Sequence, residues 1–111
     1  MQVTPQASKA TVMKLQGHIN ADNAHELKNQ LTTAVSGAEA PMVLVDMEEV
    51  ESLDSAGLMA FVSAMSLSKS VGRRFSLRSV SPSVRIIFEL SQLDRVFDIE
   101  DRGTNIGAVL A

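Results

Sequence analysis

The chain has 111 residues, a length that fits one domain with a single sizeable core, and we expect one domain over residues 1–111. Its content of 45% apolar and 21% charged residues argues against disorder, and its net charge of -3 disfavours a general nucleic-acid binder. The absence of Cys excludes disulfides, thiolate metal sites and a Cys nucleophile, and the absence of Trp and Tyr makes a base-stacking surface improbable.

The sequence contains no apolar run near the roughly 18 residues that a membrane-spanning helix needs. Residues 1–10 are polar and do not resemble a signal peptide or a transit segment. We therefore expect a cytoplasmic protein without membrane insertion.

The N-terminal part of the chain predicts two strands and a helix. Residues 11–16 have the imperfect alternation of a strand, which Gly17 is expected to end. Residues 1–6 are expected to pair with it as a short edge strand, where Pro5 is tolerated. Residue types that cap helices, followed by apolar residues at helical spacing, predict a helix over residues 23–36.

The middle of the chain predicts a buried strand and a second helix. The continuous apolar run at residues 42–45 is typical of a strand covered on both faces, and Asp46 is expected to end it. The acidic residues 48–52 are expected to form a loop or turn. Apolar residues at helical spacing predict a helix over residues 56–70.

The C-terminal part predicts a strand over residues 75–79, a third helix that begins near Pro82, and a short strand or extended segment over residues 96–99. A last short helix is expected over residues 104–111. Strands that alternate with helices imply a largely parallel sheet with right-handed crossovers, which an edge hairpin would make mixed. The buried side of the third helix is expected to contain Val84, Ile87, Phe88 and Leu90.

The segment Leu53–Leu58 is the most unusual local feature of the sequence. Asp54 or Ser55 is well placed to cap the second helix, and the segment then has a structural role only. Alternatively, Ser55 receives a phosphoryl group, which the N–H donors at a helix N-terminus would tolerate. The modification adds about -1.5 to -2 of charge at pH 7, enough to disrupt an interface. Met59 is expected to face outward beside this segment, as a contact for a protein partner.

Other chemistry has weaker support. The residues D-S-A-G do not match the G-x-S-x-G elbow of a hydrolase, and nothing fixes His18, Asp22 and His25 as a metal cluster. We therefore expect no catalytic residue, no metal site and no cofactor. The basic cluster is expected to be a salt-bridged or solvated turn, with nucleotide binding as the alternative; it contains Arg73, Arg74 and Arg78.

Four blocks of the sequence, in order, resemble the STAS domain of bacterial anti-anti-sigma factors, also called anti-sigma factor antagonists. They are residues 17–20 before the first helix, residues 43–50 around the central strand, residues 53–58 at the second helix and residues 81–90 in the third. The resemblance implies the α/β STAS fold, with a mostly parallel mixed β-sheet of four to five strands and about four α-helices.

The resemblance also implies a non-enzymatic regulator that takes part in partner switching. The unphosphorylated protein would bind an anti-sigma factor, a Ser/Thr kinase of the histidine-kinase-like ATPase type, and thereby release a sigma factor. The kinase would then phosphorylate Ser55 with its own ATP and Mg²⁺, and a PP2C-type phosphatase would reset the protein. By position in the family blocks, the partner-facing surface would include Asn20, Asp22, Asp54, Ser55, Ala56, Gly57, Leu58 and Met59.

Two departures from the family pattern affect this interpretation. Asn20 stands where phosphorylatable members usually carry Asp, which removes a negative charge near the site. Ala56 replaces a second Ser or Thr, so Ser55 is the only hydroxyl residue in its block. A second hypothesis therefore stays open, in which the domain is an unphosphorylated scaffold or an accessory subunit of a lipid-transport or other signalling complex.

Overall fold

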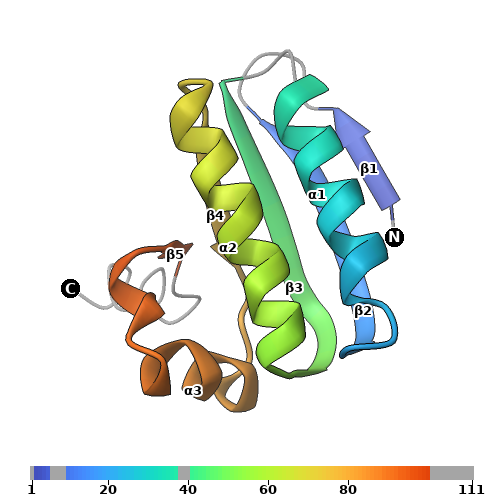
Figure 1. Cartoon of the computed structure of the whole chain (residues 1–111), viewed down its shortest axis with the longest axis vertical. Helices are drawn as coiled ribbons and strands as arrows, with labels where there is room; N and C mark the ends of the chain where they lie inside the picture. The colour runs from blue at the N-terminus through green and yellow to red at the C-terminus, as the bar shows by residue number, and fades with distance from the viewer. Residues whose placement is uncertain (1, 6–9, 38–40, 101–111) are drawn as a thin grey trace, which may run out of the picture.

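A five-stranded sheet with the order β1-β2-β3-β4-β5 forms the centre of the computed structural model (Figure 1). The structure describes residues 2–5, 10–37 and 41–100. Strand β1 is antiparallel to β2, and the other neighbouring pairs are parallel, so the sheet is mixed and mostly parallel as predicted. The strands are β1 (Gln2–Pro5), β2 (Thr11–Ile19), β3 (Met42–Leu53), β4 (Arg74–Arg78) and β5 (Asp98–Glu100).

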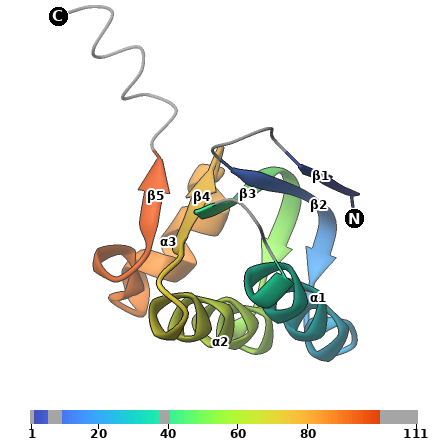
Figure 2. The same cartoon turned by 90° about the horizontal axis from the view of Figure 1, so that it is seen from above.

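The helices supply the second layer. Helices α1 and α2 lie side by side over one face of the sheet (Figure 2), and α3 packs into the same core at one end. The described part of the chain contains three α-helices and a short 3-10 turn: α1 (Ala24–Gly37), α2 (Ser55–Ser70), α3 (Pro82–Leu90) and η1 (Leu93–Arg95). The predicted helix over residues 104–111 lies outside the described residues.

The core lies between the sheet and the helices. Alternate strand residues point into it, as the period of two in a strand requires. The four Phe side chains of the chain form one connected group, in which Phe88 makes edge-on contacts with Phe61 and Phe97, and Phe97 also contacts Phe75. The inward-facing strand residues are Met13, Leu15, Val43, Val45, Met47, Phe75 and Leu77.

The opposite face of the sheet carries ion pairs. Lys14 lies 2.9 Å from Glu49, and their hydrogen bond raises the pKa of Lys14. The Ser76 hydroxyl donates to Asp98 at 2.6 Å, and Arg74 also pairs with this carboxylate. The hydrogen bond from Ser76, followed by the contact with Arg74, lowers the pKa of Asp98 against the opposing effect of burial. These pairs connect neighbouring strands across the face that lies away from α1 and α2.

Two strands are longer than the sequence predicts. β2 continues through Gly17, which adopts a positive φ of 81°, to Ile19. β3 continues past Asp46 through the acidic segment that was expected to be a loop, so that prediction is wrong. The cause is parallel pairing between β2 and β3, which extends to His18↔Ser52 and Ile19↔Leu53 with two register shifts.

Helix α3 begins as predicted, with the Ser81 hydroxyl accepting from the Val84 N–H and Pro82 in the first turn. Val84 and Phe88 are buried and Ile87 is partly buried, as predicted. Leu90 is 78% exposed, so its predicted burial is wrong. Leu90 is two positions from Phe88, which places it on another side of the helix from the core.

Candidate functional site

Two loops meet at the end of the sheet where β2 and β3 finish. Because these strands are parallel and paired up to Ile19↔Leu53, the loops that follow them leave the same edge. The Asp54 N–H donates to the Ile19 carbonyl at 3.1 Å and joins the two loops directly. The predicted site residues from residues 20–22 and 54–59 therefore belong to one end of the molecule.

Asp54 is the N-cap of α2. Its backbone is extended, and its carboxylate accepts a 3.0 Å hydrogen bond from the Gly57 N–H. This arrangement satisfies one of the N–H groups that the first helical turn leaves without an intrahelical partner. Of the two candidate caps in the sequence, the structure selects Asp54, and the Ser55 hydroxyl is not used for this purpose.

Ser55 is the first residue of α2 and is exposed to solvent. Within the described residues, its hydroxyl makes no hydrogen bond and no side chain of opposite charge pairs with Asp54. The hydroxyl is therefore open to modification from solvent, at a position where a helix dipole stabilises negative charge.

Gly57 sets the distance between α2 and the strand ends. A Cβ at this position would lie 2.5 Å from Ile19 Cγ2 and 2.6 Å from Leu53 Cδ1. Only a residue without a side chain allows the helix start to pack this closely on the sheet. Gly57 and Leu58 are both buried, so they pack α2 against the sheet and do not form the surface of the site.

The turn between β2 and α1 is held by its own side chains. The Asn20 amide oxygen accepts from the Asp22 N–H at 2.9 Å, and the Asn20 N–H donates to the Asn23 amide oxygen at 2.9 Å. Asn23 also donates to the His18 carbonyl at 2.8 Å. Asp22 is exposed, whereas the amide group of Asn20 takes part in the turn itself.

Beside Ser55, a shallow groove separates the first turns of α1 and α2. Met59 forms one of its walls and is 57% exposed, as the sequence predicts. His25 and Lys28 line the α1 side of the groove and were not predicted as site residues. Their i, i+3 spacing places them on one helix face, but only the packing of α1 beside α2 relates that face to Ser55. The groove is completed by Ala24, Ala56, Ala60 and Ser63.

The three arginines of the basic cluster have separate structural partners. Arg73 donates to the Val35 and Ser36 carbonyls, at 2.7 and 3.2 Å, and so caps the C-terminus of α1. Arg74 pairs with Asp98, and Arg78 lies 3.5 Å from Asp46. The predicted salt-bridged turn is therefore confirmed, and these side chains do not converge on one ligand site.

His18 contacts Ser52 through Nδ1 at 2.7 Å and lies 3.9 Å from Glu51. In the part of the chain that the structure describes, no three His, Cys, Asp or Glu side chains are grouped to hold a metal ion. None of the helices in these residues combines the length and apolar character that crossing a membrane requires.

Comparison with known proteins finds similar sequences over about three quarters of the chain and similar structures over nearly all of it. The protein BtrV of Bordetella bronchiseptica, named as an anti-sigma factor antagonist, is 31% identical over 85 residues, which are 77% of this chain and 72% of the relative. A Thermotoga maritima crystal structure described as an anti-sigma factor antagonist superimposes with a TM-score of 0.80 at 22% identity, covering 99% of this chain and 94% of the other.

SpoIIAA, described as an anti-sigma factor antagonist, is a third relative, with structures of two states. The unphosphorylated form has a TM-score of 0.74 at 21% identity and 97% and 94% coverage of the two chains. The phosphorylated form from Bacillus has a TM-score of 0.67 at 20% identity and 97% coverage of each. At these identities, the solved structures establish the shared fold.

The family model described as the Mlab STAS domain matches residues 3–100, which include every described helix and all but the first residue of β1. This match agrees with the sheet order and with the resemblance found in the sequence blocks. The chain therefore belongs to the STAS domain family.

Proposed function

We propose that this protein is an anti-sigma factor antagonist whose binding to an anti-sigma factor kinase is switched off by phosphorylation of Ser55. The observation that carries the proposal is the exposed Ser55 hydroxyl at the first position of α2, beside a cap that Asp54 already supplies. The name of the Bordetella relative supports the antagonist role, and the solved phosphorylated form of SpoIIAA supports a modification of this kind.

A phosphoryl group on Ser55 fits the free protein. The modification breaks no hydrogen bond of the Ser55 side chain among the described residues, and the Asp54 cap stays in place. The first-turn N–H groups and the helix dipole favour the added negative charge, and water surrounds the exposed side chain. The free phosphoprotein is therefore expected to keep its fold.

The same charge opposes binding when a partner covers the site. The phosphate and the neighbouring Asp54 carboxylate would both have to be desolvated in the interface, and they repel each other. A loss of about 3 kcal/mol in binding free energy lowers the affinity more than a hundredfold. A switch of this size needs no conformational change in the antagonist.

In this proposal the partner supplies the chemistry. An anti-sigma factor Ser/Thr kinase of the histidine-kinase-like ATPase type brings ATP and Mg²⁺, and a PP2C-type phosphatase removes the phosphoryl group. The antagonist itself is a substrate and a binding module in the cytoplasm, and it performs no catalysis. Its described surface provides the contacts: Asp22, Asp54, Ser55, Ala56 and Met59, with Asn20 in the adjoining turn.

The direct test is to incubate the protein with its kinase partner and ATP, and to map the phosphate by mass spectrometry. Phosphate at Ser55 is expected, and its absence while the kinase is active on another substrate contradicts the proposal. Calorimetry should then show weaker kinase binding by Ser55→Asp than by Ser55→Ala. Ser83→Asp is a matched control because Ser83 is also exposed in the first turn of a helix, α3.

The scaffold or accessory-subunit hypothesis is the alternative, and Asn20 in place of the family Asp favours it. In that case Ser55→Ala would retain full activity in cells, and the protein would co-purify with subunits of a transport or signalling complex. Loss of the regulatory response in Ser55→Ala cells would exclude this alternative.

A further inference from the structure

The outer edge of β2 has a strand partner along only part of its length. β1 pairs with Thr11 to Lys14, whereas β3 pairs with the opposite edge of β2 as far as Ile19. Among the described residues, no strand pairs with the outer edge from Leu15 to Ile19. The His18 carbonyl already accepts from the Asn23 amide, and the Ile19 carbonyl accepts from the Asp54 N–H. The part of this edge to which another extended segment can add is therefore Leu15 to Gly17.

Gly17 lies at the end of this part of the edge. Among the described residues, no atom comes within 4 Å of the position that a Cβ would occupy there. A glycine within a strand often marks a place where another backbone approaches closely. The positive φ of Gly17 also explains the glycine at this position, and no described side chain crowds this point of the strand.

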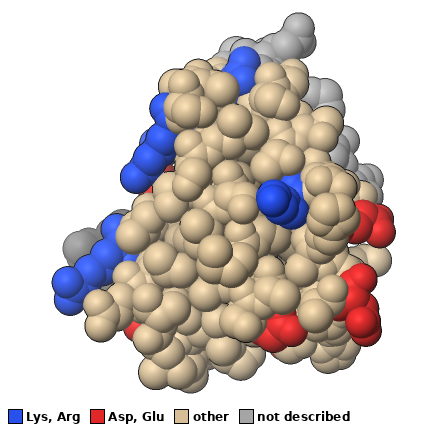
Figure 3. All heavy atoms as spheres, in the orientation of Figure 1, with Lys and Arg blue, Asp and Glu red and all other residues tan. Residues whose placement is uncertain are grey.

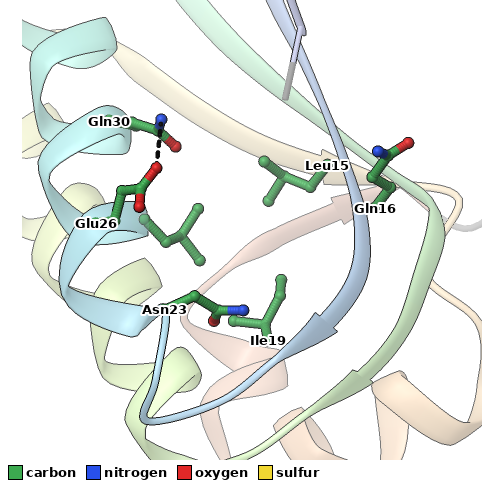
Figure 4. Close-up of a pocket in the computed structure, with 7 residues that line it drawn as sticks. Leu15, Gln16, Ile19, Asn23, Glu26 and Gln30 are labelled. Carbon is green, nitrogen blue, oxygen red and sulfur yellow. Dashed lines mark hydrogen bonds between the residues drawn. The ribbon is translucent and has the colours of Figure 1, made fainter.

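A cavity of about 180 Å³ adjoins the same edge, between β2 and the start of α1. Figure 4 shows Leu15 and Ile19 pointing from β2 toward α1, with Asn23, Glu26 and Gln30 on the helix side. Its apolar residues Leu15, Ile19 and Leu27 are all buried. A cavity of about 150 Å³ in another protein binds benzene, so this one is large enough for a Phe ring or a Leu side chain.

The rim of the cavity carries one acidic side chain, Glu26. Glu26 is exposed, and its one side-chain contact in the described chain is a 3.4 Å hydrogen bond from Gln30, with no basic partner. Asp22 precedes it in the turn before α1, and Figure 3 shows acidic side chains along the edge of the molecule on the α1 side. A ligand that carries a positive charge is therefore favoured at this site.

We propose that residues 15–17 of β2 and the adjoining cavity bind an extended peptide of a partner protein that carries a large apolar residue and, two positions away, a basic residue. The peptide adds to the sheet edge after β1, its apolar side chain enters the cavity, and its basic side chain reaches Glu26. The spacing of two follows from the geometry of a strand, because residues i and i+2 lie on the same face. This site adjoins the Ser55 region but does not include Ser55, so the two proposals can fail independently.

The test uses the ¹⁵N-labelled full chain with a C-terminal tag, so that no added residues precede β1. The probe is a capped seven-residue peptide of alternating Val and Thr, with Phe at the centre and Lys two positions away. Saturable shifts are expected at the amides of residues 15–19, and slower hydrogen exchange is expected at those of residues 15–17. Replacing Phe with Ala in the peptide should weaken binding about tenfold or more.

Variants of the protein provide matched controls. Glu26→Lys should weaken binding roughly two- to fivefold, whereas Glu89→Lys, with the same charge change on α3, should not. Gln30→Trp should block the cavity mouth, whereas Asn29→Trp, exposed and outside the cavity lining, should bind normally. The amide spectrum of each free variant establishes that it is folded.

Three results would overturn the proposal. The first is the absence of shifts at residues 15–19 with millimolar Phe–Lys peptide, and the second is equal binding of the Ala peptide. The third is a concentration-dependent shift of the same amides without peptide, because the occupant of the edge would then be a second copy of this chain.

Discussion

Replacing Gly57 with Ala tests whether close packing of α2 on the strand ends determines the position of Ser55. The new methyl group would lie 2.5 Å from Ile19 Cγ2 and 2.6 Å from Leu53 Cδ1, and both of these side chains are buried. Forcing a methyl group into such a site costs about 1–3 kcal/mol, whereas the higher helix propensity of Ala returns at most about 1 kcal/mol. We therefore expect a net loss of roughly 1–2 kcal/mol in the free energy of unfolding.

The assay is equilibrium unfolding in urea, monitored by circular dichroism. Gly37→Ala is a matched control because Gly37 is also helical, at the end of α1, and no atom of the described residues lies within 4 Å of its added Cβ. This control should be neutral or stabilised by up to about 1 kcal/mol. In the Gly57 variant, amide shifts should centre on Ile19, Leu53 and Ser55.

The reasoning would be refuted if Gly57→Ala were as stable as Gly37→Ala while the amides around Ser55 stayed unchanged. The methyl group would then be accommodated without cost, and the close approach of α2 would not determine the site. Stable folding together with large shifts at Ser55 would instead mean that the helix moves away from the strand ends, which also contradicts the expected loss of stability.

Two other predictions concern single side chains. Asp54→Ala should lower the free energy of unfolding by about 1 kcal/mol, whereas Asp54→Asn should be close to neutral because Asn also caps helices; equal urea midpoints for the two variants would contradict the cap. Asp98→Asn should destabilise the protein at pH 7. The contacts from Ser76 and Arg74 lower the pKa of Asp98 in the folded protein, so they stabilise the fold at every pH above the unfolded-state pKa of this carboxyl group. The difference from wild type should shrink as the pH falls below about 4, and a difference that stays constant in urea titrations from pH 7 to pH 3 would refute this assignment.

Local signals in the sequence predicted most of the fold. The helix starts at residues 23–24, 55–56 and 82 follow from capping residues and apolar spacing, which act within one or two turns. The second half of β3 was missed because acidic residues favour loops locally. Only pairing with β2, some 30 residues away in the chain, makes that segment a strand.

The candidate site was also predictable where it depends on local sequence signals, and not where it depends on contacts between distant segments. Asp54 and Ser55 were found because helix capping is a local property, and Met59 because it lies next to Leu58 and outside the apolar stripe of the helix. The packing role of Gly57, the groove beside Lys28 and the open edge of β2 depend on elements that meet only in the folded chain. Leu90 was placed in the core because it is apolar, although its spacing of two positions from Phe88 puts it on another side of α3.

The two faces of the sheet should respond to different solution conditions. One face is buried under α1 and α2, and unfolding exposes its apolar surface. Its contribution to the free energy of unfolding therefore varies with temperature and with urea concentration. The other face holds the pairs Lys14–Glu49, Arg78–Asp46 and Arg74–Asp98, whose attraction is screened by salt. A salt titration therefore acts mainly on contacts between neighbouring strands and leaves the contacts between helices and sheet largely unaffected. Raising the ionic strength should thus weaken the contacts on only one face of the sheet.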